Sequence, residues 1–536
     1  MLLDTCYLIR EQMKKIFIYD TTLRDGAQTE GISYSLHDKI NITKRLDDFG
    51  ISFIEGGWPY SNPKDKELFE YFRKHPLKKA KIVPFGSTAH PSHPASKDKN
   101  LLSLVKSNTE YVTIFGKTWD LHVRDILKIP LEDNLKIIFE SVKFLKKQGK
   151  KVFYDAEHFF DGFKANSNYA LKTIRAALEA GADLVIFCDT NGGTLTWQAL
   201  DIIKQVKEAL SINDFGMHCH NDLDLAVSNS ISAVKYGCSH IQGTINGYGE
   251  RCGNADLISI MAILQLKMGY DIIPANKMPT LAHLSYYVSE VSNVAHHDNH
   301  PFVGKSAFAH KGGIHIDAVI KNPLAYEHIL PSAVGNKSRF IVSELAGKST
   351  LVVKAKELEF DLNKKSPQAI RIHKLIQKLE RQGYQFEAAE GSFKLLLQKE
   401  FRKYKKFFSL LGFRVSVEKR EDGRLISEAV IKLKINDKLE HSAAEGDGPV
   451  NALDNALRKA LAKFYPTISK MHLTDFKVRV LDEKCGTAGK VRVLIQSQDE
   501  DEDWSTIGVS ENIIEASWQA LLDSVEYKLL KDSKNK

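Results

Sequence analysis

Residues 215–245 read FGMHCHNDLDLAVSNSISAVKYGCSHIQGTI and contain one complete strand-helix-strand unit. FGMHC (215–219) and HIQGTI (240–245) are short runs bounded by Asn, Asp and Gly, which is typical of strands. The segment DLDLAVSNSISAVKYG between them has the apolar spacing of an amphipathic helix. Two strands joined through a helix predict a parallel pair, because a helical crossover returns the chain to the same end of the sheet.

The same unit repeats through the N-terminal half of the chain. Eight strand candidates alternate with helical segments between residue 15 and about residue 270; the other six are KIFIY (15–19), SFIEG (52–56), KIVPFG (81–86), YVTIFG (111–116), KVFYD (151–155) and DLVIFC (183–188). Eight parallel strands and eight helices in about 255 residues predict a (β/α)8 TIM barrel, since an open doubly wound sheet of that length would usually hold fewer strands. We assign residues 1–275 to this barrel.

Two further regions follow the barrel. Residues 276–407 read as a mainly helical subdomain, which we expect to contribute to the active site. From residue 408 to 536 strands return, and two ββα-like halves predict a small C-terminal α/β regulatory domain. Aligning Asn451 with Asn512 places one apolar helix face opposite another: Leu453, Leu457, Leu461 and Phe464 opposite Ile514, Trp518, Leu522 and Val525.

Composition narrows the functional classes. The 536 residues are 43% hydrophobic and 26% charged, and no apolar run approaches the ~20 residues of a membrane-spanning helix. A net charge of +8 without a basic cluster interleaved with aromatic residues gives little support for nucleic-acid binding. Six cysteines stand without CxxC pairs, which argues against disulfides and thiolate zinc sites and favours a reducing cytoplasm: Cys6, Cys188, Cys219, Cys238, Cys252 and Cys485.

Polar side chains at the ends of three strands predict a metal site. His218 and His220 point to the same side of the seventh strand, because side chains alternate along a strand. Asp25 follows the first strand and Asn254 follows the eighth. Alone, an HxH pair often packs in a core and an aspartate often caps a helix. Because strands 7, 8 and 1 are neighbours in a closed barrel, we expect all four residues to share one divalent ion, Mg²⁺, Mn²⁺ or Zn²⁺.

Several strings in the chain resemble a known enzyme family. DTTLRDG, HCHND, INGYGERCGN and FAHKGGIH are similar to the family of 2-isopropylmalate, homocitrate and citramalate synthases, over nearly the whole chain. YDTTLRDG, EGGWPYSNPKD, TIFGKTWDLHV, DAEHFFDG and CDTNGGTL look most like its citramalate branch. The resemblance implies a metal-dependent Claisen condensation of acetyl-CoA with a 2-oxo acid, pyruvate in that branch, followed by thioester hydrolysis. Ala27 stands where many relatives carry an acid, but it is not among the four expected ligands.

The resemblance also implies roles for residues outside the metal set. Arg24 is expected to donate to the ketone oxygen as it becomes an alkoxide, and Glu157 to take part in acid/base work. Gln28 and Thr190 are expected to contact the substrate, although a threonine there could simply start a helix. His315 resembles the catalytic histidine of the family. Tyr326 is its expected partner, unless this tyrosine only packs.

Assembly and regulation rest on the same resemblance. It implies a homodimer and a branched-chain amino acid, isoleucine, as effector of residues 408–536, where Gly446-Asp-Gly448 and Gly486-Thr-Ala-Gly489 form glycine-rich turns. A purely structural dimerisation module is the alternative for this domain. For the whole chain, the first alternative is a 2-isopropylmalate or homocitrate synthase, which would take a different 2-oxo acid. A metal-dependent acyl-CoA lyase or aldolase and a non-catalytic amino-acid sensor are the more remote alternatives.

Overall fold

The computed structural model describes residues 15–342, 348–481 and 488–534. Cys6, Cys485 and part of the second glycine-rich turn, Gly486 and Thr487, lie outside these residues. The chain separates into two compact units, which are described one at a time. The first comprises Met1–Phe308 and Ile329–Lys337, and the second comprises Ala309–His328 and Ser338–Lys536.

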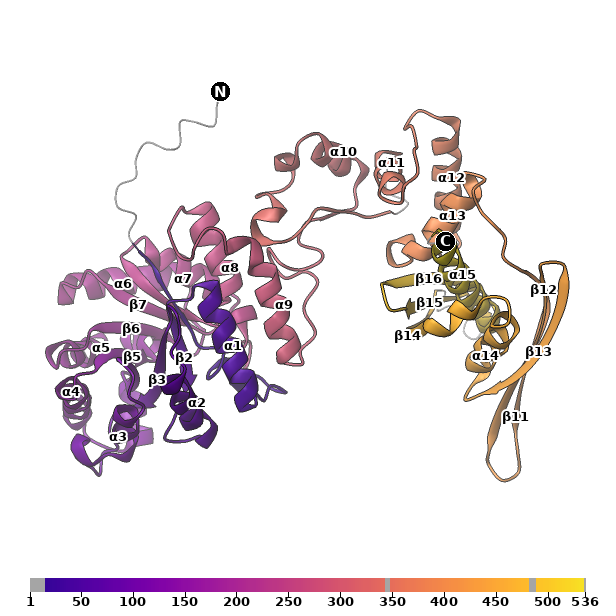
Figure 1. Ribbon diagram of the computed structural model, residues 1–536. Coiled ribbons are helices and arrows are strands. Elements are labelled where there is room, and N and C mark those ends of the chain that lie inside the picture. The colour runs from indigo at the N-terminus through magenta and orange to yellow at the C-terminus, as the bar shows by residue number, and fades with distance from the viewer. Residues whose placement is uncertain (1–14, 343–347, 482–487, 535–536) are drawn as a thin grey trace. The chain divides into compact units, whose positions relative to one another are not determined.

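The first unit contains a closed barrel of eight parallel strands, which confirms the expected TIM barrel (Figure 1). The strands run in chain order around the barrel: β1 (Phe17–Asp20), β2 (Phe53–Gly57), β3 (Lys81–Ser87), β4 (Tyr111–Lys117), β5 (Lys151–Glu157), β6 (Leu184–Asp189), β7 (Phe215–Cys219) and β8 (Cys238–Gly243). β8 closes the barrel against β1 with Tyr19 opposite Gln242. Closure makes the ends of β7, β8 and β1 neighbours in space.

Helices follow the strands and cover the outside of the barrel (Figure 1). They are α1 (Leu36–Phe49), α2 (Pro63–Lys74), α3 (Lys99–Lys106), α4 (Leu131–Lys147), α5 (Phe159–Glu179), α6 (Thr196–Leu210), α7 (Ala226–Val234) and α8 (Leu257–Ala262). α1 shows how local sequence sets a boundary. Ser35 and Asp38 form a reciprocal capping box at its start, and Gly50 ends it with a φ of 109°, which favours glycine.

The barrel unit extends beyond residue 275. α9 (Leu281–Val291) packs through Leu281, Leu284 and Val288 into the same apolar core as the barrel helices. Phe308 also belongs to this core, and so does Val334 from the returning segment Ile329–Lys337. Residues 276–308, which the sequence assigns to the following subdomain, are therefore compact with the barrel.

The second unit combines helices with two antiparallel sheets. Its helices before residue 408 are α10 (Gly313–Lys321), α11 (Lys348–Glu357), α12 (Pro367–Arg381) and α13 (Glu390–Glu400). One sheet contains β11 (Ser409–Lys419), β12 (Leu425–Ile435) and β13 (Lys438–Gly446), and the other contains β14 (His472–Val480), β15 (Val491–Gln498) and β16 (Asp503–Ser510). Each half thus has three strands, and the strand that the sequence did not predict lies in the first half. The third strand of the first half, KLEHSAAEG, is too polar to read as a strand.

The last two helices share one core. α14 (Pro449–Leu461) and α15 (Ile513–Lys534) each follow a three-stranded sheet. Leu453, Leu457, Trp518 and Val525 belong to a single buried cluster. The alignment of the two helical faces predicted from sequence is thereby confirmed. Among the described residues, no helix has the length and apolar character to cross a membrane.

Candidate metal centre

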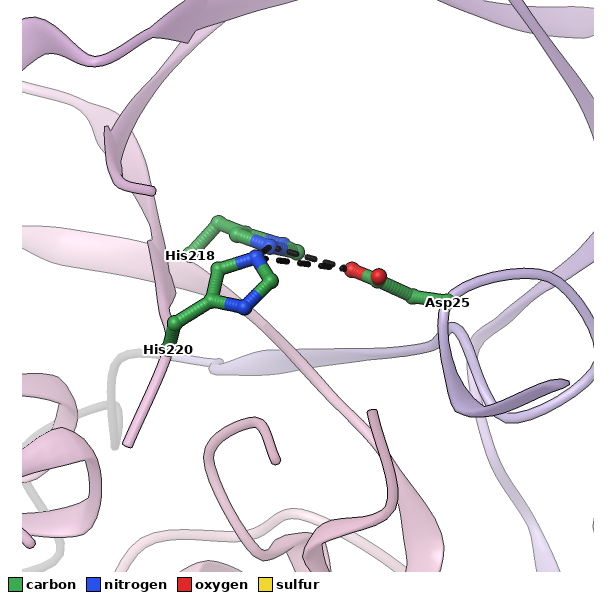
Figure 2. A group of neighbouring side chains, drawn as sticks. All are labelled: Asp25, His218 and His220. Atoms are coloured by element: carbon green, nitrogen blue, oxygen red, sulfur yellow. Dashed lines mark hydrogen bonds and ion pairs between the residues drawn. The ribbon is translucent and has the colours of Figure 1, made fainter. Parts of the chain in front are cut away.

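Three buried side chains from two strand ends converge at the mouth of the barrel (Figure 2). Asp25 lies in the loop after β1, His218 is in β7, and His220 directly follows β7. The Oδ2 atom of Asp25 is 3.3 Å from Nε2 of His218 and 3.9 Å from Nε2 of His220. The two imidazole Nε2 atoms are 3.4 Å apart. One carboxylate and two imidazoles at this spacing form a donor set that suits a divalent cation.

Asn254 completes the expected group of four. A backbone bridge pairs it with His220, so the loop after β8 is held against the end of β7. Its Nδ2 donates to Oδ2 of Asp25 at 2.7 Å. Its Oδ1 is buried and makes no hydrogen bond. The NH₂ group rather than Oδ1 faces Asp25, so a half turn of the amide would present this unpartnered oxygen to a cation held by Asp25.

Burial and neighbouring charges set the protonation states of the three side chains at this centre. Burial opposes ionisation of Asp25, but Arg24 and His218 hold its pKa well below the usual range. Burial, reinforced by neighbouring His218, lowers the pKa of His220 to about 3. For His218, burial is outweighed by the hydrogen bond and the charge of Asp25, so its pKa is raised. A carboxylate and at least one neutral imidazole are therefore present near neutral pH, as cation binding requires.

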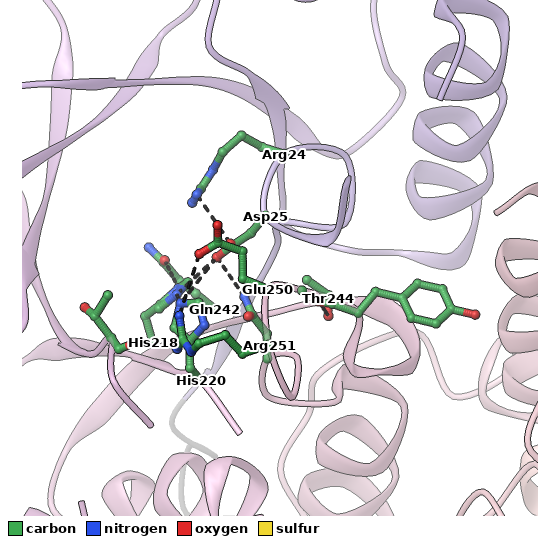
Figure 3. Close-up of polar contacts among 12 residues, drawn as sticks. Arg24, Asp25, His218, His220, Gln242, Thr244, Glu250 and Arg251 are labelled. Carbon is green, nitrogen blue, oxygen red and sulfur yellow. Dashed lines mark hydrogen bonds and ion pairs between the residues drawn. The ribbon is translucent and has the colours of Figure 1, made fainter. Parts of the chain in front are cut away.

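Arg24 is held beside the centre by a buried acid. Its Nε donates to Oε1 of Glu55 at 2.5 Å, and its guanidinium lies 3.8 Å from the ring centroid of Phe85. The other oxygen of Glu55 accepts from the Tyr19 hydroxyl at 2.8 Å. Nη1 of Arg24 lies 3.6 Å from Oδ1 of Asp25 (Figure 3). Arg24 is thus a fixed cationic donor next to the candidate metal ligands.

A cavity of about 240 Å³ opens on these residues. Its lining includes the other barrel residues expected from sequence, Gln28, Glu157 and Thr190. Oε2 of Glu157 forms an ion pair with Lys117 at 2.5 Å. The Thr190 hydroxyl accepts from the backbone N–H of His158 at 2.9 Å, so it has a structural role in addition to facing the cavity. The barrel therefore brings seven of the ten expected site residues together: Arg24, Asp25, Gln28, Glu157, Thr190, His218 and His220 line this cavity.

The other three expected residues do not line this cavity. Asn254 contacts Asp25 without lining the cavity itself. His315 and Tyr326 belong to the second unit, where their rings stack with centroids 4.3 Å apart. Both residues therefore belong to the second unit. His315 lies in α10, near the start of that unit.

Comparison with known proteins gives the family. Over 520 residues the chain is 52% identical to the (R)-citramalate synthase of Aquifex aeolicus, covering 97% of this chain and 98% of that protein. The (R)-citramalate synthase of Geobacter sulfurreducens is 51% identical with the same coverage. The chain belongs to the citramalate synthase family. As a member of the citramalate synthase family it is an acyltransferase.

Three family models match successive parts of the chain. An HMGL-like domain matches residues 15–285, a homocitrate synthase post-HMGL domain-like segment matches residues 302–383, and a LeuA allosteric (dimerisation) domain matches residues 387–529. The 2-isopropylmalate synthase of Methanocaldococcus jannaschii is 29% identical over 97% of this chain and 96% of that protein. The sequence identity of the chain to the two citramalate synthases is thus much higher than its identity to this 2-isopropylmalate synthase.

Several residues at this candidate site were not singled out from the sequence. Glu55, Lys117, Asp155 and Gln242 all lie on barrel strands and contact expected site residues directly or through one another. A signal was available for two of them, because Glu55 and Asp155 are acids near the carboxyl ends of otherwise apolar strands. Nothing in a lone glutamine such as Gln242 distinguishes it from a surface residue before the barrel is closed.

Proposed function

We propose that this chain condenses acetyl-CoA with pyruvate and releases (R)-citramalate and coenzyme A. The observation that carries the proposal is the identity of 52% over nearly the whole chain to a protein named (R)-citramalate synthase. The barrel-mouth centre of Asp25, His218 and His220 with Arg24 alongside supports it, because this reaction needs a polarised ketone and a stabilised alkoxide.

The proposed mechanism assigns a role to each group of residues. Asp25, His218, His220 and Asn254 would hold a divalent cation, which when bound supplies a Lewis acid and a template for the oxo acid. Arg24, fixed by Glu55, donates to the ketone oxygen as negative charge develops there.

The carbon–carbon bond then forms between the two substrates. A general base, with Glu157 and His315 as candidates, removes a proton from the acetyl methyl group, and the resulting enolate carbon attacks the ketone carbon of pyruvate. The alkoxide takes up a proton. Water attacks the thioester carbonyl, and coenzyme A leaves as a thiol. The hydrolysis makes the sequence irreversible.

A second cavity adjoins the one at the candidate metal centre and suits the coenzyme. Its volume is about 570 Å³, and both cavities are lined by Trp58 and Phe115. Lys97 and Lys99 line it as well, and their positive charges match the phosphates of coenzyme A. We therefore place acetyl-CoA in this cavity with its acetyl group toward Arg24.

Thiol release measures the reaction directly. The chain is incubated with acetyl-CoA, Mn²⁺ and either pyruvate, 2-oxobutyrate or 2-oxoisovalerate, and free coenzyme A is detected. We expect the highest kcat/KM with pyruvate. The margin between neighbouring acceptors is expected to be ~1–3 kcal/mol, because only one or two methyl groups distinguish them. A clear preference for 2-oxoisovalerate would move the assignment to 2-isopropylmalate synthase.

Metal dependence is tested by His218→Ala with metal content measured alongside turnover. We expect loss of both. His37→Ala, at an exposed position of α1, is the matched control and should retain both. Full activity in a His218→Ala protein free of metal would remove the cation from the mechanism.

We further propose that the chain is a homodimer in which His315 of one subunit serves the barrel of the other. The match of residues 387–529 to a dimerisation domain supports the assembly. Mixing inactive His218→Ala and His315→Ala chains should restore activity in heterodimers, because one barrel then has all its groups. Verified heterodimers without activity would assign each site to a single chain.

Isoleucine is the proposed effector of the C-terminal region, because citramalate can serve as a precursor of this amino acid. A coupling of ~1–3 kcal/mol would change substrate affinity several-fold. Calorimetry with isoleucine, leucine and valine, together with activity assays, tests this regulation. If none of the three binds, the region has only a structural role.

A further inference from the structure

A chain of three buried polar side chains runs behind the metal centre. His218 and Gln242 lie opposite each other on neighbouring strands β7 and β8, and Asp155 comes from β5. Their exposed fractions are 6%, 0% and 4%. Nδ1 of His218 is 2.8 Å from Oε1 of Gln242, and Nε2 of Gln242 donates to Oδ1 of Asp155 at 3.1 Å. Figure 3 shows Gln242 beside His218.

The first hydrogen bond of this chain decides which nitrogen of His218 is free. A neutral imidazole carries one proton, and a metal binds only the nitrogen that lacks it. Because Oε1 of Gln242 can only accept, Nδ1 of His218 must carry the proton. Nε2, the atom that faces Asp25, is then available as a ligand.

The second hydrogen bond decides which way the glutamine amide points. The oxygen and the NH₂ group of a glutamine are nearly the same size, so a half turn of the amide would present NH₂ to His218. The carboxylate of Asp155 has only acceptor atoms, and it therefore requires the NH₂ group on its own side. The amide oxygen is left facing His218.

We propose that Asp155 is a positioning residue for the metal centre: acting through Gln242, it keeps the proton of His218 on Nδ1 and leaves Nε2 free for the cation. The functional meaning of this chain rests on the metal site proposed above. Asp155 also lines the substrate cavity, so its effect on the metal must be separated from any effect on substrate.

An exchange of the two side-chain types tests the direction of the hydrogen bonds. In Asp155→Asn, the new amide can donate to Gln242, which then turns and offers its own NH₂ group to His218. In the double variant Asp155→Asn with Gln242→Glu, the carboxylate and the amide have changed places. The new glutamate accepts from both neighbours, so Nδ1 of His218 is again required to carry the proton, and the net charge equals that of the wild type.

Binding of Mn²⁺ is the first readout, measured by calorimetry at pH 8, above the pKa of Asp155, which burial raises to about 7. We expect Asp155→Asn to bind Mn²⁺ ~10- to 100-fold more weakly. The double variant should recover an affinity near that of the wild type. Asp20→Asn is the matched control, because it also neutralises a buried barrel carboxylate whose pKa burial raises to about 7, but one whose side chain accepts from Thr22, and it should keep its Mn²⁺ affinity.

The protonation of His218 is the second readout, and it needs no metal. In metal-free protein labelled with ¹⁵N-histidine, with the signal assigned through His218→Ala, Nδ1 should carry a proton in the wild type and in the double variant. It should lack one in Asp155→Asn. If the wild type binds no Mn²⁺ but this pattern holds, the metal proposal fails and the positioning role stands.

Two results would overturn the positioning role. One is an unchanged protonation of His218 in Asp155→Asn. The other is a double variant that is folded, by its circular dichroism and melting temperature, but binds Mn²⁺ no better than Asp155→Asn. A loss of Mn²⁺ affinity in Asp20→Asn equal to that in Asp155→Asn would assign the effect to buried charge in general and would also overturn it.

Discussion

His240 provides a test of the barrel interior by acid. The side chain points into the barrel from β8 and is 1% exposed. The rings of Tyr19, Phe53 and Phe153 surround it at centroid distances of 5.1, 5.6 and 4.9 Å. Its Nε2 has no hydrogen-bond partner. Burial alone lowers the pKa of His240 to about 3.

This pKa makes the barrel less stable in acid. The unfolded chain takes up a proton at this histidine below its ordinary pKa of ~6.5, whereas the folded chain does not until about pH 3. The contribution to stability is therefore complete above pH 6.5 and is lost as the pH falls from 6.5 toward 3. The slope is ~1.4 kcal/mol per pH unit, so the loss at pH 5 is about 2 kcal/mol.

His240→Leu removes the titrating ring and keeps an apolar side chain of similar volume. Relative to the wild type, the variant should gain about 2 kcal/mol between pH 7.5 and pH 5, because the other titrating groups are common to both proteins. Urea unfolding of the barrel at both pH values measures this difference. A difference in stability between variant and wild type that does not change with pH would show that the ring is hydrated or already protonated.

Three further outcomes are expected. Chelation should stop coenzyme A release and Mn²⁺ should restore it, because the proposed ligands converge on one ion. Glu55→Gln should lower kcat and raise KM for the oxo acid, because Arg24 loses the carboxylate that holds it. That charge-assisted hydrogen bond is worth roughly 1.5–3 kcal/mol. Steady-state kinetics measure the effect, and unchanged constants would contradict the prediction. Leu453→Ala should destabilise the second unit by roughly 2–5 kcal/mol while the barrel transition in calorimetry stays in place; a shift of both transitions would mean that the units unfold together.

Much of the site follows from local pattern in the sequence. The alternation of short strands and amphipathic helices predicts the barrel, because each βα unit carries its own apolar periodicity. The spacing of two residues between His218 and His220 predicts that they face the same side, because side chains alternate along a strand. Asp25 and Asn254 follow from the strand order, which places β8 next to β1.

The buried polar partners of these residues could be found only from the tertiary structure. Gln242 and Asp155 are 87 residues apart, and Arg24 and Glu55 are 31 apart, so no local periodicity links either pair. The return of Ile329–Lys337 to the barrel core likewise depends on packing between distant segments. A sequence determines which faces are apolar and which strand ends are polar. The partners that buried polar groups find are set by closure of the barrel, because a closed interior excludes water and therefore favours the pairing of buried donors with acceptors.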